Sequence, residues 1–247
     1  MLYRLEDTHK VSYITKDNNE TMLLSCIQKV MGEIYVNDLE HPESIVFIIG
    51  EFCFLFGKVN HDLKFDNDFM IVVCDNEQWA RFIENHYTYK KVTRYALKKE
   101  RDVFDKKKLQ RIIDMLDKQY RIKKIDEDLY NECKKYSWSK DLVASYNDYI
   151  MFKNIGLGFV IMKDKEIIAG ASSYSTYKEG IEIEKDTKQE YRRQGLASII
   201  GARLILECLD RNLYPSWDAH TKISLCLAER LGYHFDYEYI AYEIYSK

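Results

Sequence analysis

The hydrophobic positions of the C-terminal half follow two patterns in succession. Up to Thr187 they alternate with polar positions, as in antiparallel strands, and beyond Arg192 they recur with the period of a helix. The alternation predicts a meander of strands at 120–125, 158–162, 167–174 and 181–187. The later residues predict a largely buried helix at 192–213, a short strand at 214–218, a helix at 224–231 and a closing β segment at 235–245. We therefore expect a mixed, mostly antiparallel sheet flanked by helices.

The N-terminal half has the pattern of a smaller α/β domain. It predicts a helix at 21–32 capped by Asn18 or Asn19, two strands within 44–59, a strand at 69–74, a helix after Asp75, a strand at 90–97 and a helix after Asp105. A boundary after the last helix gives domains at 1–118 and 119–247 of an α/β protein of the α+β type. The first domain resembles a truncated copy of the second, which predicts a degenerate repeat. That hypothesis fails if the two strand orders differ.

Composition narrows the classes of function. The net charge of −3 over 247 residues provides no basic field for nucleic acid or an anionic membrane. No segment approaches the ~18 uninterrupted apolar residues of a membrane span. The six cysteines and six histidines show no metal-ligand spacing, so no metal is expected. Scattered cysteines and the lack of an apolar leader predict a cytoplasmic protein.

Candidate chemistry lies where the last meander strand gives way to the buried helix. The segment Arg192-Arg193-Gln194-Gly195-Leu196-Ala197-Ser198 opens that helix, where backbone N–H groups have no acceptor within the helix. Gly195 allows close approach, and the helix dipole and two arginines add positive charge. A pyrophosphate fits this turn. An isolated R-x-x-G-x-A is more often a helix start with surface arginines, and the meander before it and Ala228–Tyr233 after it make it specific.

These elements resemble the GNAT superfamily of acetyltransferases over residues 120–245, with the acetyl-CoA signature at Arg192–Ala197. The segment Leu213–Ala219 and the two-part layout are similar to the bacterial branch that includes the zwittermicin A resistance protein. The resemblance implies an acetyl-CoA-dependent N-acetyltransferase that acts on a small-molecule primary amine by direct attack. The resemblance is also compatible with a homodimer.

The resemblance also assigns the cofactor site. The end of the last meander strand separates from its neighbour and offers backbone groups to the pantetheine arm. The turn then holds the pyrophosphate. The residues assigned to acetyl-CoA are Lys185, Asp186, Thr187, Arg192, Arg193, Gln194, Gly195, Leu196, Ala197 and Ser198.

Acetyl transfer needs a base for the amine and a proton donor for the leaving thiolate. Glu182 and Glu184 share one face of the strand 181–187, and Glu182 is ranked first because it lies deeper. Each is as readily explained as a polar strand face. Thr221 and Ala228 replace the Asn and Tyr of many members, which leaves the acid open. Tyr233 is a candidate, as are His220, other nearby tyrosines and water.

Other functions remain open. A non-catalytic acyl-CoA-binding or regulatory relative would keep the turn and lack the acid. A protein that acts through protein contacts would have no acyl-CoA affinity. The acceptor is expected to meet residues 126–156, where Trp138 and Tyr146–Tyr149 offer aromatic and acidic groups suited to an amine.

Overall fold

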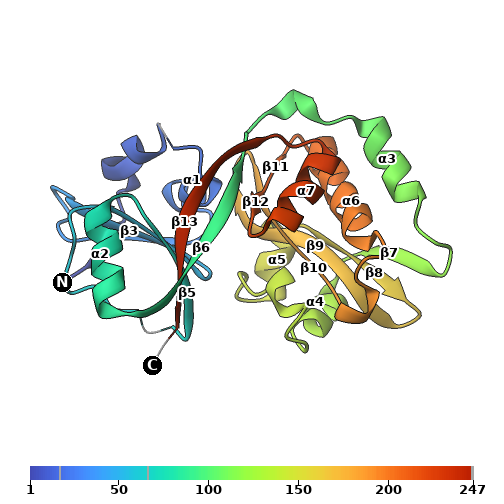
Figure 1. Ribbon diagram of the computed structural model, residues 1–247, viewed down its shortest axis with the longest axis horizontal. Helices are drawn as coiled ribbons and strands as arrows, with labels where there is room; N and C mark the ends of the chain where they lie inside the picture. Colours follow the sequence, from blue (N-terminus) through green and yellow to red (C-terminus); the bar gives the residue numbers. More distant parts are fainter. Residues whose placement is uncertain (17, 66, 246–247) are drawn as a thin grey trace. The chain divides into compact units, whose positions relative to one another are not determined.

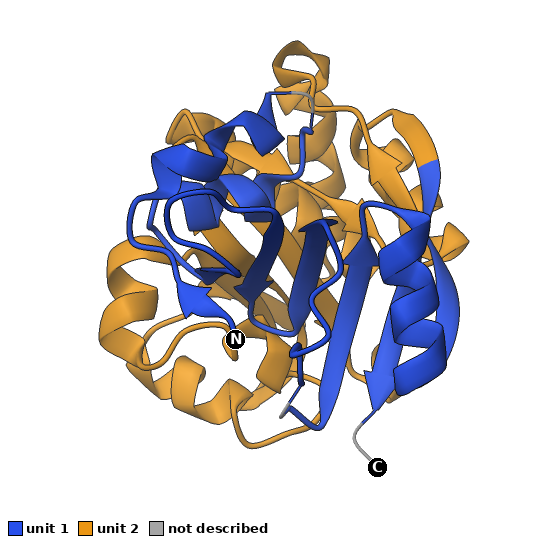
Figure 2. Cartoon of the chain, turned by 90° about the vertical axis from the view of Figure 1, so that its left-hand side faces the viewer, with its two compact units in different colours: residues 1–94, 238–247 blue, residues 95–237 orange. Residues whose placement is uncertain are grey.

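The structure is a computed structural model that describes residues 1–16, 18–65 and 67–245. The chain divides into two compact units, coloured separately in Figure 2. Unit 1 contains Met1–Arg94 and Glu238–Lys247, and unit 2 contains Tyr95–Tyr237. The predicted boundary at residue 118 therefore falls inside unit 2, and the last strand returns to unit 1. The long strands β6 (Thr88–Leu97) and β13 (Phe235–Tyr245) each pass from one unit into the other.

Unit 2 is built around a five-stranded sheet in the order β11-β10-β9-β8-β7. Its strands are β7 (Tyr120–Lys124), β8 (Gly158–Lys163), β9 (Glu166–Tyr177), β10 (Gly180–Thr187), β11 (Tyr214–Ser216) and, outside this sheet, β12 (Asp218–Ala219). Its helices are α3 (Lys106–Asp114), α4 (Glu127–Cys133), α5 (Tyr149–Ile155), α6 (Leu196–Asp210) and α7 (Lys222–Leu231), with 3-10 turns η2 (Arg101–Val103), η3 (Lys140–Leu142) and η4 (Gln189–Tyr191). Pairing is antiparallel from β7 to β10 and parallel between β10 and β11.

Helices cover both faces of this sheet (Figure 1). α6 and α7 lie over one face, and α4, α5 and η3 lie over the other. Leu204 and Ile205 of α6 are fully buried and share a core with Ile181 and Ile183 of β10. The predicted helix at 192–213 begins only at Leu196, because Arg193 and Gly195 have positive φ angles that no α-helix accommodates.

Unit 1 contains a sheet in which β1-β2-β3-β4-β5 is followed by β13 and β6. Its elements are β1 (Tyr3–Arg4), the 3-10 helix η1 (Thr8–Thr15), α1 (Thr21–Ile27), β2 (Glu33–Val36), β3 (Ser44–Ile49), β4 (Phe52–Gly57), β5 (Phe69–Cys74) and α2 (Glu77–His86). β1 to β4 pair antiparallel, and β4 pairs with β5 in parallel. Two predicted caps were wrong: Glu20 caps α1 and Asn76 caps α2.

Candidate active site

The turn before α6 has the backbone of an anion-binding site. Gly195 is the N-cap residue of α6 with φ +81°, and Arg193 also lies in the left-handed region with φ +63°. Such a conformation at a non-glycine residue costs roughly 1 kcal/mol, and it turns successive N–H groups toward one side. An ideal Cβ built on Gly195 meets no atom within 4 Å. The N–H groups at the start of α6 therefore face open space.

This turn forms one wall of a cavity of about 810 Å³. The cavity brings together nine of the ten residues predicted to bind the cofactor, namely Lys185, Asp186, Thr187, Arg192, Arg193, Gly195, Leu196, Ala197 and Ser198. Gln194 is outside the lining, and its Oε1 accepts a hydrogen bond from the Tyr120 hydroxyl at 3.0 Å. Gln194 thus fastens the turn to β7.

The opposite wall is α7. The sequence predicts this helix but does not assign it to the cofactor site. It contributes Thr221, Lys222, Ile223, Cys226, Leu227 and Arg230. Ile223 is 84% exposed, although its place in the helical pattern is that of a core residue. The spacing of Ile223, Leu227 and Arg230 was the available signal, because it marks one face of the helix. The lining includes the apolar side chains of Leu196, Ile223 and Leu227, and it also includes positive charge from Arg193, Lys222 and Arg230.

Arg192 lines the cavity and also bonds to the end of β10. Its Nε donates to the Thr187 carbonyl at 2.9 Å, and its Nη2 lies 3.3 Å from a carboxylate oxygen of Asp186. Both partners belong to the end of β10. Arg192 therefore ties that strand end to the turn, while Arg193 stays exposed and without such a contact among the described residues.

β10 and β11 separate along the cavity. Their parallel pairing ends at Glu182 and Ser216, because the chain then leads into β12, which pairs with β6. Residues 183–187 consequently have no strand on this side among the described residues, and their backbone groups face the gap. The hydroxyl of Thr187, 7% exposed, also has no hydrogen-bond partner among the described residues. The amides of Lys185 and Thr187 donate to the carboxylates of Glu184 and Asp186. The edge itself has no neighbouring strand among the described residues, so a ligand with amide groups, such as a pantetheine arm, can lie along it.

Side chains of β10 alternate between two environments. Ile181 and Ile183 face the core under α6, so Glu182, Glu184 and Asp186 point to the other face, where η3 contacts the strand. Burial raises the pKa of Glu184 to about 7, and the nearby Asp141 carboxylate of η3 adds to the rise. Burial also raises the pKa of Asp141, with a further contribution from Asp186. These carboxylates form an acidic cluster beside the gap.

The two predicted glutamates differ in burial. Glu182 is 4% exposed and lies opposite the buried Ser175 of β9, so it is enclosed in the sheet. Glu184 is only partly buried, and its Oε1 accepts a hydrogen bond from the Lys185 amide at 2.9 Å. Neither glutamate is in the lining of the cavity, and Glu184 is the more exposed of the two.

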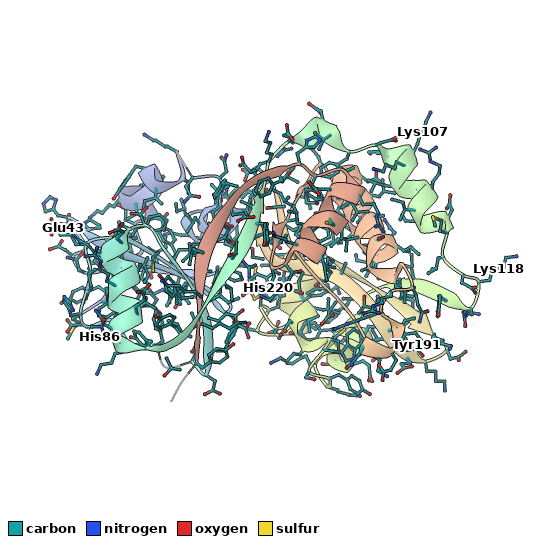
Figure 3. All side chains as sticks on the ribbon, in the orientation of Figure 1. Glu43, His86, Lys107, Lys118, Tyr191 and His220 are labelled. Atoms are coloured by element: carbon teal, nitrogen blue, oxygen red, sulfur yellow. The ribbon has the colours of Figure 1, made fainter. Side chains whose placement is uncertain are left out.

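Tyr233 lies in the core of unit 2. It is 2% exposed, its ring packs against Phe104 and Trp217, and its hydroxyl donates to the Pro215 carbonyl. Burial raises its pKa well above the ordinary value. It is not among the residues that line the cavity, and neither is His220, which follows β12 (Figure 3). The structure therefore does not bring this predicted acid to the site.

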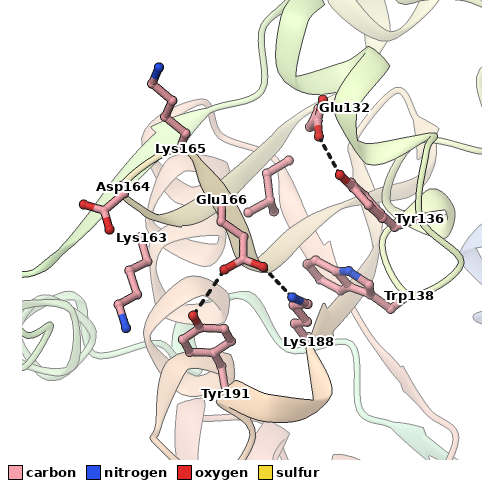
Figure 4. Close-up of a pocket in the computed structure, with 10 residues that line it drawn as sticks. Glu132, Tyr136, Trp138, Lys163, Asp164, Lys165, Glu166, Lys188 and Tyr191 are labelled. Carbon is pink, nitrogen blue, oxygen red and sulfur yellow. Dashed lines mark hydrogen bonds and ion pairs between the residues drawn. The ribbon is translucent and has the colours of Figure 1, made fainter.

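A second cavity of about 500 Å³ lies at the β8–β9 turn (Figure 4). Tyr191 lines both cavities, so the two adjoin. Lys188 and the Tyr191 hydroxyl both bond to Glu166, and Trp138 lies beside Lys188. Of the predicted acceptor residues, Trp138 reaches this cavity. Tyr146 instead packs inside, with its hydroxyl bonded to Ser173 and Thr176.

Within residues 1–16, 18–65 and 67–245, no group of three or more His, Cys, Asp or Glu side chains is arranged to hold a metal ion. The same ranges contain no helix that is long and apolar enough to cross a membrane.

The antiparallel meander, the parallel crossover through a buried helix, and the turn that opens this helix define an acyltransferase of the GNAT fold class. The family model described as "GNAT acetyltransferase" matches residues 12–242. The chain belongs to the GNAT acetyltransferase family.

Individual relatives agree with this assignment. The chain is 44% identical to a GCN5-related N-acetyltransferase-like protein from Streptococcus suis 89/1591, with a TM-score of 0.91 over 97% of this chain and 98% of that one. It is 25% identical to the uncharacterized N-acetyltransferase YdfB of Bacillus subtilis (strain 168) over 87% of this chain and 86% of YdfB. A tandem GNAT protein from the clavulanic acid biosynthesis pathway, 7% identical over 98% of both chains with a TM-score of 0.57, shares the fold.

Proposed function

We propose that this acetyltransferase transfers an acetyl group from acetyl-CoA to a primary amine of a small molecule, by direct attack within a ternary complex. The observation that carries the proposal is the cavity between α6 and α7. It joins an anion-accepting turn to the end of β10, whose edge has no neighbouring strand among the described residues beyond Glu182. A diphosphate followed by an amide-containing arm has the chemistry of both parts in the same order.

The turn would hold the pyrophosphate through amides at the start of α6, with Arg193, Lys222 and Arg230 adding charge. The pantetheine arm would run along the free edge of β10. Its amides would satisfy backbone groups of residues 183–187, and the Thr187 hydroxyl is within this wall. The thioester would then lie near Glu182 and Ser216, where β10 and β11 begin to separate.

Glu184 would act as the base. The incoming amine is protonated at neutral pH and must lose a proton before its nitrogen can attack the thioester carbonyl. A carboxylate with a pKa of about 7 is well matched to that task near neutrality. Asp141 and Asp186 add negative charge on the same side, which favours a cationic acceptor over a neutral or anionic one.

The second candidate is a non-catalytic acyl-CoA-binding protein, which Ala228 favours. Ala228 is fully buried at the position where many members carry the tyrosine acid, and Tyr233 is held in the core. Both candidates require binding of acetyl-CoA. Only the enzyme requires release of the free thiol when an amine is present.

A screen separates the two. The full chain is mixed with acetyl-CoA and a panel of primary amines that includes diamines and amino sugars, and release of the thiol is followed with a thiol reagent. We expect turnover with a subset of cationic amines and none in the Gly195→Glu variant. Binding of acetyl-CoA without turnover on any amine would favour the non-catalytic candidate. The zwittermicin A branch, a homodimer and a cytoplasmic location stay predictions.

A further inference from the structure

Lys185 holds a cation at the point where β10 and β11 separate. Pairing of these strands ends at Ser216, and Trp217 is the next residue. The ammonium of Lys185 lies 5.1 Å from the centre of the Trp217 ring. Lys185 extends from one of the two separating segments and Trp217 from the other, so this ammonium lies across the gap near its narrow end.

Lys185 faces the same cavity as the anion-accepting turn. It lines that cavity together with Thr187 and Leu196. Its neighbour Glu184 is not in this lining and points to the opposite face of β10, as strand alternation requires, whereas Asp186 also reaches the cavity. The strand thus presents a carboxylate on one face and an ammonium on the other, at consecutive positions.

The reaction proposed above lacks a proton donor among the residues that the family pattern suggests. When the tetrahedral intermediate collapses, sulfur leaves as a thiolate and needs a proton or a cation nearby. Ala228 has no donor, and the Tyr233 proton is already bonded to Pro215. Among the described lining residues, Lys185 is the cation nearest to the point of strand separation. The other cations in this lining, Arg192, Arg193, Lys222 and Arg230, belong to the turn and to α7.

We propose that Lys185 is the general acid that protonates the sulfur of coenzyme A. The proposal rests on the acetyl transfer proposed above. The amine nitrogen forms a bond to the carbonyl carbon, and the carbon–sulfur bond breaks with its electron pair passing to sulfur. A proton moves from Nζ of Lys185 to that sulfur. Lys185 then regains a proton from solvent, while the two protons lost by the acceptor ammonium leave through Glu184 and solvent.

The electrostatic surroundings support this division of roles. Burial lowers the pKa of Lys185, which makes its ammonium a stronger acid, although Glu184 and Asp186 act in the opposite direction. Arg192 and Arg193 of the turn, and Lys222 and Arg230 of α7, add positive charge around the cavity, and Asp218 of β12 is a partly buried carboxylate near Trp217. Burial thus moves the pKa of Glu184 up and that of Lys185 down, both toward the neutral range in which a base and an acid work best.

The test measures the thiol of bound coenzyme A, which requires no acceptor. Free coenzyme A is added to the full chain, and the ultraviolet absorbance of its thiolate is followed against pH in the wild type, Lys185→Met and Lys185→Arg. Lys188→Met is the matched control, because Lys188 is a nearby lysine that bonds to Glu166 in the adjoining cavity. Urea denaturation of each variant checks that it folds.

We expect the wild type to lower the thiol pKa by about 1 unit or more, because a cation next to the sulfur favours the thiolate. Lys185→Met should abolish this shift, whereas Lys185→Arg and Lys188→Met should retain it. Turnover of an amine found in the screen should fall roughly 100-fold in Lys185→Met and in Lys185→Arg, since arginine keeps its proton. A thiol pKa that is the same in the wild type and Lys185→Met would overturn the proposal. Absence of coenzyme A binding in the wild type would instead overturn the proposed function.

Discussion

The two units of this chain share a plan of strands and differ in one connection. In each, three successive antiparallel pairings lead to one parallel pairing, between β4 and β5 in unit 1 and between β10 and β11 in unit 2. The parallel pairing of unit 2 is joined through the turn and α6. In unit 1 the described residues between β4 and β5, 58–65 and 67–68, contain no helix.

This difference teaches where the function resides. A parallel pair needs a crossover, and a crossover that contains a helix also supplies a helix N-terminus next to the strand end. Unit 2 has that N-terminus and a cavity beside it, whereas the short connection of unit 1 cannot provide one. The sheet alone therefore does not make the site.

The shared plan bears on the predicted repeat. Helical elements occupy corresponding places, with η1 and α1 between β1 and β2, and α4, η3 and α5 between β7 and β8. The order β1-β2-β3-β4-β5 matches the order β7-β8-β9-β10-β11, but the first sheet continues through β13 and β6, whereas the second ends at β11. The repeat therefore stays a prediction. The closing strands are exchanged: β13 pairs with β5 in unit 1, and β6 pairs with β12 in unit 2. We propose that unit 1 is a copy of the acetyltransferase plan that has lost its cofactor turn.

The largest effect should come from the base. Glu184→Gln removes the proton acceptor, so turnover of a responsive amine should fall by ~100-fold or more while acetyl-CoA affinity changes little. The matched variant is Glu243→Gln, which alters a buried strand glutamate of unit 1. It should leave turnover unchanged. Equal losses in the two variants, measured by steady-state kinetics, would show that the effect is structural.

Replacing Glu184 should also change stability in a pH-dependent way, and the change should have the opposite sign to that at Glu84 of unit 1. In the folded chain Glu184 keeps its proton up to about pH 7, against an ordinary pKa of 4.5. The free energy of unfolding therefore falls as pH rises from about 4.5 through 7, because the folded state holds this proton more tightly than the unfolded state. Glu184→Gln should stabilise the protein by about 2 kcal/mol at pH 8 and by much less at pH 4.

Glu84 of unit 1 provides the contrast. Lys91 and the Tyr242 hydroxyl lower its pKa, so it contributes stability at neutral pH that is lost as pH falls through its folded pKa. Glu84→Gln should accordingly destabilise at pH 8 and have little effect at low pH. Urea denaturation of both variants at several pH values measures this. If Glu184→Gln and Glu84→Gln change the free energy of unfolding at pH 8 in the same direction, the account of Glu184 is contradicted.

The smallest effect concerns two cysteines. Cys226 of α7 is exposed in the cavity wall of unit 2, and Cys74 of unit 1 is partly buried. Acetyl-CoA should slow alkylation of Cys226 several-fold by covering it, and should not change the rate at Cys74. Mass spectrometry of the labelled peptides follows each thiol. Protection of both, or of neither, would place the ligand elsewhere.

The meander and the cofactor turn could be predicted from the sequence because alternation, helical period and Gly195 are local signals. The wall formed by α7 had only a weak local signal, the spacing of Ile223, Leu227 and Arg230 on one helix face, because an exposed Ile223 has the same sequence pattern as a core residue. Tyr233 was assigned by its distance along the chain, which is unrelated to burial. The domain boundary was displaced because β13 returns to unit 1, and such a return depends on pairing between residues far apart in sequence.

The central claim is that unit 2 binds acetyl-CoA at the turn before α6, and calorimetric titration of the full chain with acetyl-CoA tests it most directly. The wild type is compared with Gly195→Glu, with Gly195→Ala, whose methyl group meets open space, and with Lys64→Glu in the short connection of unit 1. We predict binding by the wild type, a loss of about 100-fold or more in Gly195→Glu, and at most a several-fold loss in the two controls. Binding by Gly195→Glu equal to that of the wild type, or no binding by the wild type, would contradict the account.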